Sequence, residues 1–239
     1  DFDGILLNVT FEDNWKELYD GAKVEYGADG SMRCLLPDGR RFEHRDHLLQ
    51  LVGDPLQNST ADIDQVEPDQ VPLRLDYSAA MALHRIAVAE GNRRGFSVHG
   101  EIVSPFDCLC VLLGLENAMM ALVTDGEKCE AILDRYVEQC AAFAKAQIDT
   151  GVDAMKISSP FAGGSFISRE YYARFVLPFE RRVVEWIHRY APSVPVYTHT
   201  CGFIGDRLDL MAECGIDGLE CMDPPPLGNT LLQDAKEQV

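Results

Sequence analysis

The chain of 239 residues carries 39 Asp and Glu against 21 Lys and Arg, which gives a formal net charge of -18. A surface this acidic repels phosphate backbones and anionic lipid, so we expect no nucleic-acid partner and no membrane partner. Hydrophobic residues make up 46% of the chain, enough for one substantial core, yet no apolar run approaches the roughly 20 residues needed to span a bilayer.

The eight cysteines are few for a chain of this length. Most of them lie in apolar or helical patterns, as buried free thiols do. This usage favours a reducing compartment, and we predict a cytoplasmic location. The chain begins at Asp1 without a methionine and stops at Val239 inside a predicted helix, so we expect a fragment that is truncated at both ends.

The first third of the chain predicts a strand, a meander and a surface connection. The buried strand covers residues 3–9. Two turn signals, Asp29-Gly30 and Pro37-Asp38-Gly39, then separate short β-prone runs over 22–46 and indicate a small antiparallel meander. Pro, Asn, Asp and Ser are frequent over 53–72, which predicts a surface connection.

The meander and the connection together predict an insertion at about 20–75 within a single domain that covers 1–239. A helix is predicted to follow, because apolar residues recur at helical spacing. These residues are Leu75, Ala79, Ala82, Leu83 and Ile86.

From Gly95 onward, strands and helices alternate. Strands are predicted at 96–103, 154–158, 194–201 and 216–222, and helices at 124–150, 169–190 and 204–214. Thr124 and Glu127 predict a capping box at the first helix, and Pro178 predicts a kink in the second. The alternation indicates a parallel α/β sheet but does not separate a barrel from an open doubly wound sheet.

Two similar segments, Gly151-Val-Asp-Ala and Gly215-Ile-Asp-Gly, each end a helix and lead directly into a strand. This repetition is typical of successive βα units. Neither a GxGxxG nor a GxxxxGK[ST] phosphate loop occurs in the chain, which weakens the nucleotide-binding form of the open sheet.

His199 and Cys201 form the most informative pair. Two residues apart on a strand that ends at Gly202, they are predicted to share a face at its carboxyl end, where α/β sites form. Imidazole and thiolate together suit Zn²⁺. The alternative is a buried histidine beside a packed thiol, which the spacing alone leaves open.

Several ordered motifs resemble the uroporphyrinogen decarboxylase and corrinoid/coenzyme M methyltransferase superfamily. They lie mainly over 95–239, with a looser likeness over 1–75. They are Ser104-Pro-Phe106, Gly151-Val-Asp-Ala, Ser158-Ser-Pro-Phe-Ala-Gly163, Ser168, Phe175-Val-Leu-Pro178, His199-Thr-Cys-Gly202, Asp206-Arg-Leu and Gly215-Ile-Asp-Gly. The resemblance implies an eight-stranded TIM-type (β/α)8 barrel, present here as an incomplete fragment.

Within that superfamily, the methyltransferase branch binds zinc through an H-x-C pair and a later cysteine near the carboxyl terminus. His199 and Cys201 match the pair, and the later cysteine has no counterpart before Val239. Cys214 and Cys221 are interpreted as packing residues. The resemblance therefore implies a zinc site that is incomplete in this fragment, together with a corrinoid carried by a partner protein.

The decarboxylase branch uses acidic residues that this chain lacks at the matching positions. Asn8 stands near the position of its strand-end carboxylate, and Ser158-Ser-Pro-Phe161 replaces an Asp-Ser-Trp motif. Decarboxylation of a uroporphyrinogen-type substrate is therefore the second hypothesis. We expect Asn8, Ser158 and Phe161 to contribute to substrate binding.

Other polar residues lie near predicted strand ends. His99 and Glu101 share one face of their strand, and Glu220 and Asp223 flank the last strand. We predict Glu101 and Asp223 as catalytic candidates, Glu220 as a third metal ligand, and His99 and Tyr171 as substrate-binding residues. For each, a solvated residue at a pocket rim is the plainer alternative.

Three functions are consistent with these residues. The leading hypothesis is a zinc-dependent methyltransferase that moves a methyl group between a corrinoid protein or methylated substrate and a thiol or similar acceptor. The second is the decarboxylase. The third is a barrel that docks a corrinoid protein and has no catalysis of its own.

Overall fold

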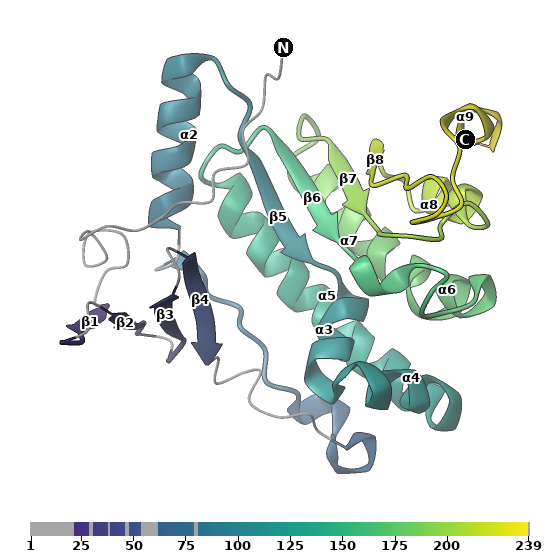
Figure 1. Ribbon diagram of the computed structural model, residues 1–239, viewed down its shortest axis with the longest axis horizontal. Helices are drawn as coiled ribbons and strands as arrows, with labels where there is room; N and C mark the ends of the chain where they lie inside the picture. Colours follow the sequence, from purple (N-terminus) through teal and green to yellow (C-terminus); the bar gives the residue numbers. More distant parts are fainter. Residues whose placement is uncertain are drawn as a thin grey trace.

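The computed structural model describes residues 22–28, 31–37, 39–45, 48–53, 62–78 and 81–238. The predicted strand at 3–9, which includes Asn8, and the predicted Asp29-Gly30 turn lie outside these residues. The described chain contains two four-stranded sheets, one antiparallel and one parallel, together with helices (Figure 1).

The antiparallel sheet lies where the meander was predicted and has strand order β1-β2-β3-β4. Its strands are β1 (Lys23–Tyr26), β2 (Met32–Leu35), β3 (Arg41–Arg45) and β4 (Leu48–Gly53). At the turn between β2 and β3, the Leu36 N–H donates to the Arg40 carbonyl, and Gly39 has a φ of 86°. Because a side chain disfavours positive φ, glycine suits this position.

The connection contains two short 3-10 turns, η1 (Ile63–Gln65) and η2 (Pro68–Gln70), before helix α2 (Ala82–Arg94). The helix begins later than the apolar spacing predicts. Leu75 and Ile86 are 56% and 55% exposed, so the predicted apolar face is wrong at both positions.

The parallel sheet has strand order β5-β6-β7-β8, the order of the strands along the chain. Its strands are β5 (His99–Val103), β6 (Ala154–Ser158), β7 (Val196–His199) and β8 (Gly218–Glu220). Neighbours that follow one another in the chain, joined by helices, are the arrangement of successive units in an α/β barrel. Strands β5, β7 and β8 are shorter than predicted, because flanking residues belong to loops, whereas β6 covers the predicted residues 154–158.

Helices cover one face of the parallel sheet (Figure 1). The helices that follow β5 in the chain are α3 (Pro105–Leu113), α4 (Leu115–Thr124), α5 (Gly126–Ile148), α6 (Arg169–Phe175), α7 (Leu177–Tyr190), α8 (Leu208–Glu213) and α9 (Leu232–Gln238). Of these helices, α5 contacts β5 and α7 contacts β7. The main core lies between the sheet and α3, α5 and α7, and includes the fully buried Ile102, Met155 and Ile157. Burial of this apolar surface holds the sheet in place.

Two local predictions are wrong. Thr124 ends α4 and does not start a capping box; Asp125 caps α5, accepting a hydrogen bond from the Lys128 N–H at 3.3 Å. The helix predicted over 169–190 is broken at Val176, two residues before the predicted kink. Pro178 explains the break, because proline fits the first turn of a new helix but not the interior of a continuous one.

No single helix in the described ranges combines the length and the hydropathy needed to cross a membrane. Helices α3 and α4 meet that criterion only when they are taken together, and they are bent by 106° at their junction.

Candidate metal centre

The face of the parallel sheet that is turned away from the helices carries a row of polar side chains. Because side chains alternate along a strand, Ile102 of β5 and Ile157 of β6 point into the core. The residues next to them on each strand therefore lie on the opposite face. Strand register then aligns side chains across the sheet: Glu101 beside Lys156 and Tyr197, and Val103 beside Ser158, His199 and Glu220. The second row lies at the carboxyl ends of the strands.

His199, the last residue of β7, lies in this second row, and its Nε2 atom is 3.2 Å from the Cys201 Sγ atom. The strand ends at His199, so Cys201 belongs to the following loop and is exposed. The predicted pair is therefore adjacent in space. A third side chain joins it: the Cys221 Sγ atom, from the segment after β8, is 3.8 Å from the same nitrogen.

Close backbone contacts hold the loop that carries Cys201. The Gly202 N–H donates to the Asp223 carboxylate at 2.8 Å, which ties the loop after β7 to the segment after β8. A Cβ atom on Gly163 would lie 2.4 Å from the Cys201 carbonyl oxygen, and one on Gly228 would lie 2.4 Å from that of Gly202. Only glycine fits at either position, so the loop is packed between two neighbouring segments.

Glu220 lies on the other side of the imidazole. Its carboxylate is 3.3 Å from His199 Nδ1, without the alignment of a hydrogen bond, whereas both sulfur atoms face Nε2. A carboxylate beside one ring nitrogen commonly orients a histidine that binds metal through the other.

The remaining polar side chains of this face are paired with one another. Glu101, a predicted catalytic candidate, forms an ion pair with Lys156 at 3.1 Å. His99 Nδ1 lies 2.9 Å from the Tyr197 hydroxyl, and its Nε2 lies 2.8 Å from Ser97. Burial raises the pKa of Tyr197 to about 12, and nearby carboxylates add to the shift.

Tyr197 was missed in the sequence, although it stands two residues before His199 and therefore on the same face of the strand. Cys221 was interpreted as a packing residue. Its place beside His199 follows from the parallel pairing of β7 with β8, which makes the loops at their carboxyl ends adjacent.

The three other predicted substrate-binding residues in the described chain differ in position. Ser158 lies beside His199 in the strand register. Phe161, in the 3-10 turn η4 (Pro160–Ala162), packs edge-on against Phe166 at 5.5 Å. Tyr171 lies on α6 with its ring 5.5 Å from that of Phe175, which is fully buried. The structure therefore brings Ser158 to the cluster, whereas the contacts found for Phe161 and Tyr171 are made elsewhere.

A buried polar layer lies directly behind the loop after β6. The Ser159 N–H donates to the His199 carbonyl, and its hydroxyl donates to Ser104, which in turn donates to Asp107. Burial raises the pKa of Asp107 to about 6, against three hydrogen bonds that lower it. Burial also raises the pKa of Glu180 to about 7, and Asp107 adds to that shift.

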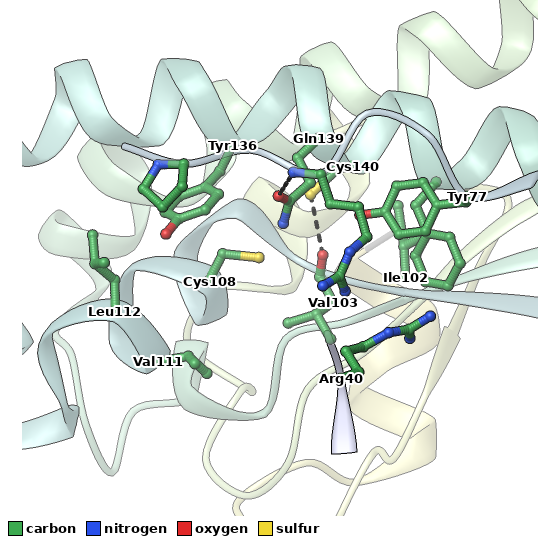
Figure 2. Close-up of a pocket in the computed structure, with 13 residues that line it drawn as sticks. Arg40, Tyr77, Ile102, Val103, Cys108, Val111, Leu112, Tyr136, Gln139 and Cys140 are labelled. Atoms are coloured by element: carbon green, nitrogen blue, oxygen red, sulfur yellow. Dashed lines mark hydrogen bonds between the residues drawn. The ribbon is translucent and has the colours of Figure 1, made fainter. Parts of the chain in front are cut away.

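A separate cavity of about 210 Å³ lies beside the edge strand β5 and the helices α3 and α5 (Figure 2). Its walls are largely apolar, with Tyr77, Tyr136 and Phe143 among the lining residues, and among the described residues that line it the charged ones are Arg40 and Arg74. Gln139 accepts a hydrogen bond from the Arg74 N–H at 2.8 Å. The residues of this cavity were not predicted as a site.

The fold and the polar row define an α/β protein with a cluster of possible metal ligands at the carboxyl ends of parallel strands. The model of the uroporphyrinogen decarboxylase (URO-D) family matches residues 51–230. The match covers more than half of the chain, and the chain belongs to this family. Its fold is accordingly the URO-D family fold that the motifs predicted.

Relatives from both branches of the superfamily match the chain. A methylated-thiol–coenzyme M methyltransferase of Methanosarcina mazei is 33% identical over 116 residues, 48% of this chain and 30% of that protein. A methylcobamide:CoM methyltransferase of Methanosarcina acetivorans is 30% identical over 50% of this chain and 34% of its own length. A uroporphyrinogen decarboxylase of a Synechococcus species is 24% identical over 70% of this chain and 47% of its length.

A solved methyltransferase from Methanosarcina mazei has a similar fold, with a TM-score of 0.58 and 17% sequence identity. The likeness covers 83% of this chain and 52% of that one. The chain thus spans between about a third and half of the length of these relatives.

Proposed function

We propose that this chain forms part of a zinc-dependent methyltransferase that moves a methyl group between a corrinoid protein or methylated substrate and a thiol acceptor. The observation that carries the proposal is the pair of His199 Nε2 and Cys201 Sγ, 3.2 Å apart at the carboxyl end of β7. The names of two relatives, which act on coenzyme M, support the thiol, and one of them supports the corrinoid.

The donor set fits zinc. One imidazole nitrogen and one exposed thiol face the same point, and imidazole and thiolate are ligands that Zn²⁺ prefers. The buried Nδ1 atom of His199 lies beside Glu220, so we infer that Glu220 orients the ring; its role as a third ligand remains the alternative. When bound, zinc would act as a Lewis acid that lowers the pKa of a thiol from about 8.5.

The chain's own residues would bind and orient the substrate. His99, Ser158 and Tyr197 lie on the same face as His199, and we infer that they contact polar groups of the acceptor. Glu101 is held by Lys156 on that face and is about half exposed, and we infer that it can reach a bound substrate. Roles for Asn8, Phe161 and Tyr171 stay predictions.

The test is the zinc content per chain of the purified protein and of His199→Ala and Cys201→Ala, measured by elemental mass spectrometry under reducing conditions. We expect near-stoichiometric zinc in the unchanged protein and its loss in both variants. His188→Ala is the control, because His188 lies on α7 beside Asp217 and away from the cluster. Zinc-loaded protein should then transfer a methyl group from a methylated corrinoid protein to coenzyme M. No methylated product should form when either the corrinoid protein or coenzyme M is left out.

Decarboxylation is the second candidate, because the decarboxylase covers 70% of this chain, the largest share among the three sequence relatives named. It predicts release of carbon dioxide from uroporphyrinogen without metal. Absence of zinc together with such activity would overturn the methyltransferase proposal. Unchanged metal content in both variants, with neither activity, would leave only the docking role.

A further inference from the structure

Cys221 brings a second sulfur atom to the imidazole of His199. Its Sγ atom lies 3.8 Å from Nε2, and the Cys201 Sγ atom lies 3.2 Å from the same nitrogen. The three ligand atoms all lie within 4.8 Å of one another. With Zn–S near 2.3 Å and Zn–N near 2.0 Å, the ligand atoms of a tetrahedral site are roughly 3.5 to 3.8 Å apart. The cluster is thus close to the size that one ion requires.

The backbone of Cys221 is also unusual. Its φ of 62° is the only positive value at a non-glycine residue in the described part of the chain. Cysteine gains nothing locally from this conformation, so the surrounding structure must impose it. Three hydrogen bonds of Asp223 do so: its N–H donates to the Cys221 carbonyl, its carboxylate accepts from Gly202, and its carbonyl accepts from Thr230.

The surroundings differ from those of a packing cysteine. Cys110, Cys129 and Cys214 are at most 3% exposed and lie in the apolar core. Cys221 is only half-buried, and it faces an imidazole and the exposed thiol of Cys201. Polar ligand atoms directed at one point, from two successive loops, are typical of a metal site.

We propose that Cys221 is the third protein ligand of the metal that His199 and Cys201 bind, which completes a one-nitrogen, two-sulfur set within this chain. The inference rests on the proposed metal site and adds to it a ligand from the segment after β8. Three protein ligands leave a tetrahedral ion one position for an exogenous thiol.

Cobalt(II) in place of zinc tests the proposal, because thiolate ligands give cobalt a near-ultraviolet charge-transfer band whose intensity scales with their number. We expect Cys221→Gly and Cys201→Ser each to lose about half of this intensity and the double variant to lose all of it. Competition with a chromophoric chelator should show zinc affinity lowered more than about 100-fold in Cys221→Gly, since losing even an outer-shell partner commonly costs 10- to 100-fold.

Glycine is the substitution of choice because it removes the thiol and relieves the positive φ. If Cys221 has a purely structural role, Cys221→Gly should bind metal as tightly as the parent. If Cys221 is a ligand, the variant should bind metal more weakly. In that case the metal-free variant should have a melting temperature no lower than that of the metal-free parent. Cys108→Ser on α3 is the matched control and should keep both band and affinity.

The outcomes separate this inference from the proposed function. Full charge-transfer intensity and parental zinc affinity in Cys221→Gly would overturn the third ligand and leave the His199–Cys201 site standing. Loss of metal in Cys221→Gly, with no methyl transfer by the zinc-loaded parent, would support the ligand and overturn the reaction. Failure of the parent to bind either metal would overturn both.

Discussion

Asp223 lies between the two segments that carry the sulfur atoms of the cluster. It was predicted as a catalytic candidate from its position after the last strand, and its carboxylate accepts a hydrogen bond from the Gly202 N–H at 2.8 Å. Through this bond it links the loop that carries Cys201 to the segment that carries Cys221. We infer that Asp223 positions the two sulfur atoms.

Replacement of Asp223 distinguishes positioning from direct participation. Asp223→Ala removes the acceptor, and we expect zinc affinity to fall about 10-fold, as for other outer-shell partners. Asp223→Asn keeps an oxygen that can accept from Gly202 and should retain most of the affinity. Chelator competition measures both. An equal loss in the two variants would show that the negative charge matters, as it would for a ligand or a base.

The sequence predicted part of this site and missed part of it. Two-residue alternation placed His199 and Cys201 on one face, and they are adjacent, although Cys201 lies beyond the strand end. Cys221 was missed because its position depends on a positive φ and on hydrogen bonds between two loops. Such contacts leave no periodic signal in the sequence.

At the scale of elements, the repeated Gly-x-Asp segment has a physical basis. Gly151 and Gly215 have φ values of 93° and 85°, as a residue that ends a helix often does. The aspartate two residues later accepts from a strand N–H of the preceding unit: Asp153 from Val98 at 2.7 Å, and Asp217 from Val196 at 2.8 Å. Each aspartate also donates its own N–H back to the same residue.

Asp217→Ala should therefore destabilise the protein by about 1 to 2 kcal/mol, because the Val196 N–H loses its acceptor at the start of β7. This hydrogen bond is also the main reason that the pKa of Asp217 is lowered. Urea unfolding gives the free energy. Asp134→Ala is the control: its carboxylate pairs with Arg182 at the surface, and its loss should cost no more than about 1 kcal/mol. If Asp217→Ala and Asp134→Ala lowered the free energy of unfolding equally, the hydrogen bond of Asp217 would not have the stabilising role that we assign to it.

Over 95–239 the predicted helices and strands have the right type, but helices α3 and α4 were not predicted, and several boundaries were misplaced. The repeated Gly-x-Asp segment predicted the start of β6 at Ala154 correctly, whereas β8 begins at Gly218, two residues after its predicted start. The start of α5 was misplaced because Thr124 and Asp125 are both good caps, and α4 extends through the first of them. Competing local signals of this kind are resolved only by packing.

At the scale of the whole molecule, the buried acids make stability depend on pH. Glu180 is 2% exposed on α7, and its pKa of about 7 exceeds the unfolded value of 4.5. The folded state then binds the proton more tightly, so the free energy of unfolding falls as pH rises from about 4.5 to 7. Asp107, whose pKa rises from 3.8 to about 6, contributes in the same direction.

Glu180→Gln should remove much of this dependence. A shift of this size corresponds to about 3 kcal/mol, so the variant should be more stable than the parent at pH 8 and should lose less stability between pH 5 and 8. Urea unfolding at both pH values is the measurement. Glu185→Gln, at an exposed position on the same helix, should follow the parent. A parent whose stability rises over this range would contradict the assignment.

Cys201 and Cys221 also make the cluster sensitive to oxidation. Their sulfur atoms lie within 4.8 Å of each other, so a modest side-chain movement would bring them to disulfide distance. Oxidation by peroxide would take two electrons and two protons from the pair and release water. Because the proposed site binds its metal through thiolates, a disulfide here would remove both sulfur donors in one event. A bound ion would protect the pair, and protein handled in air without metal would lose its capacity to take one up.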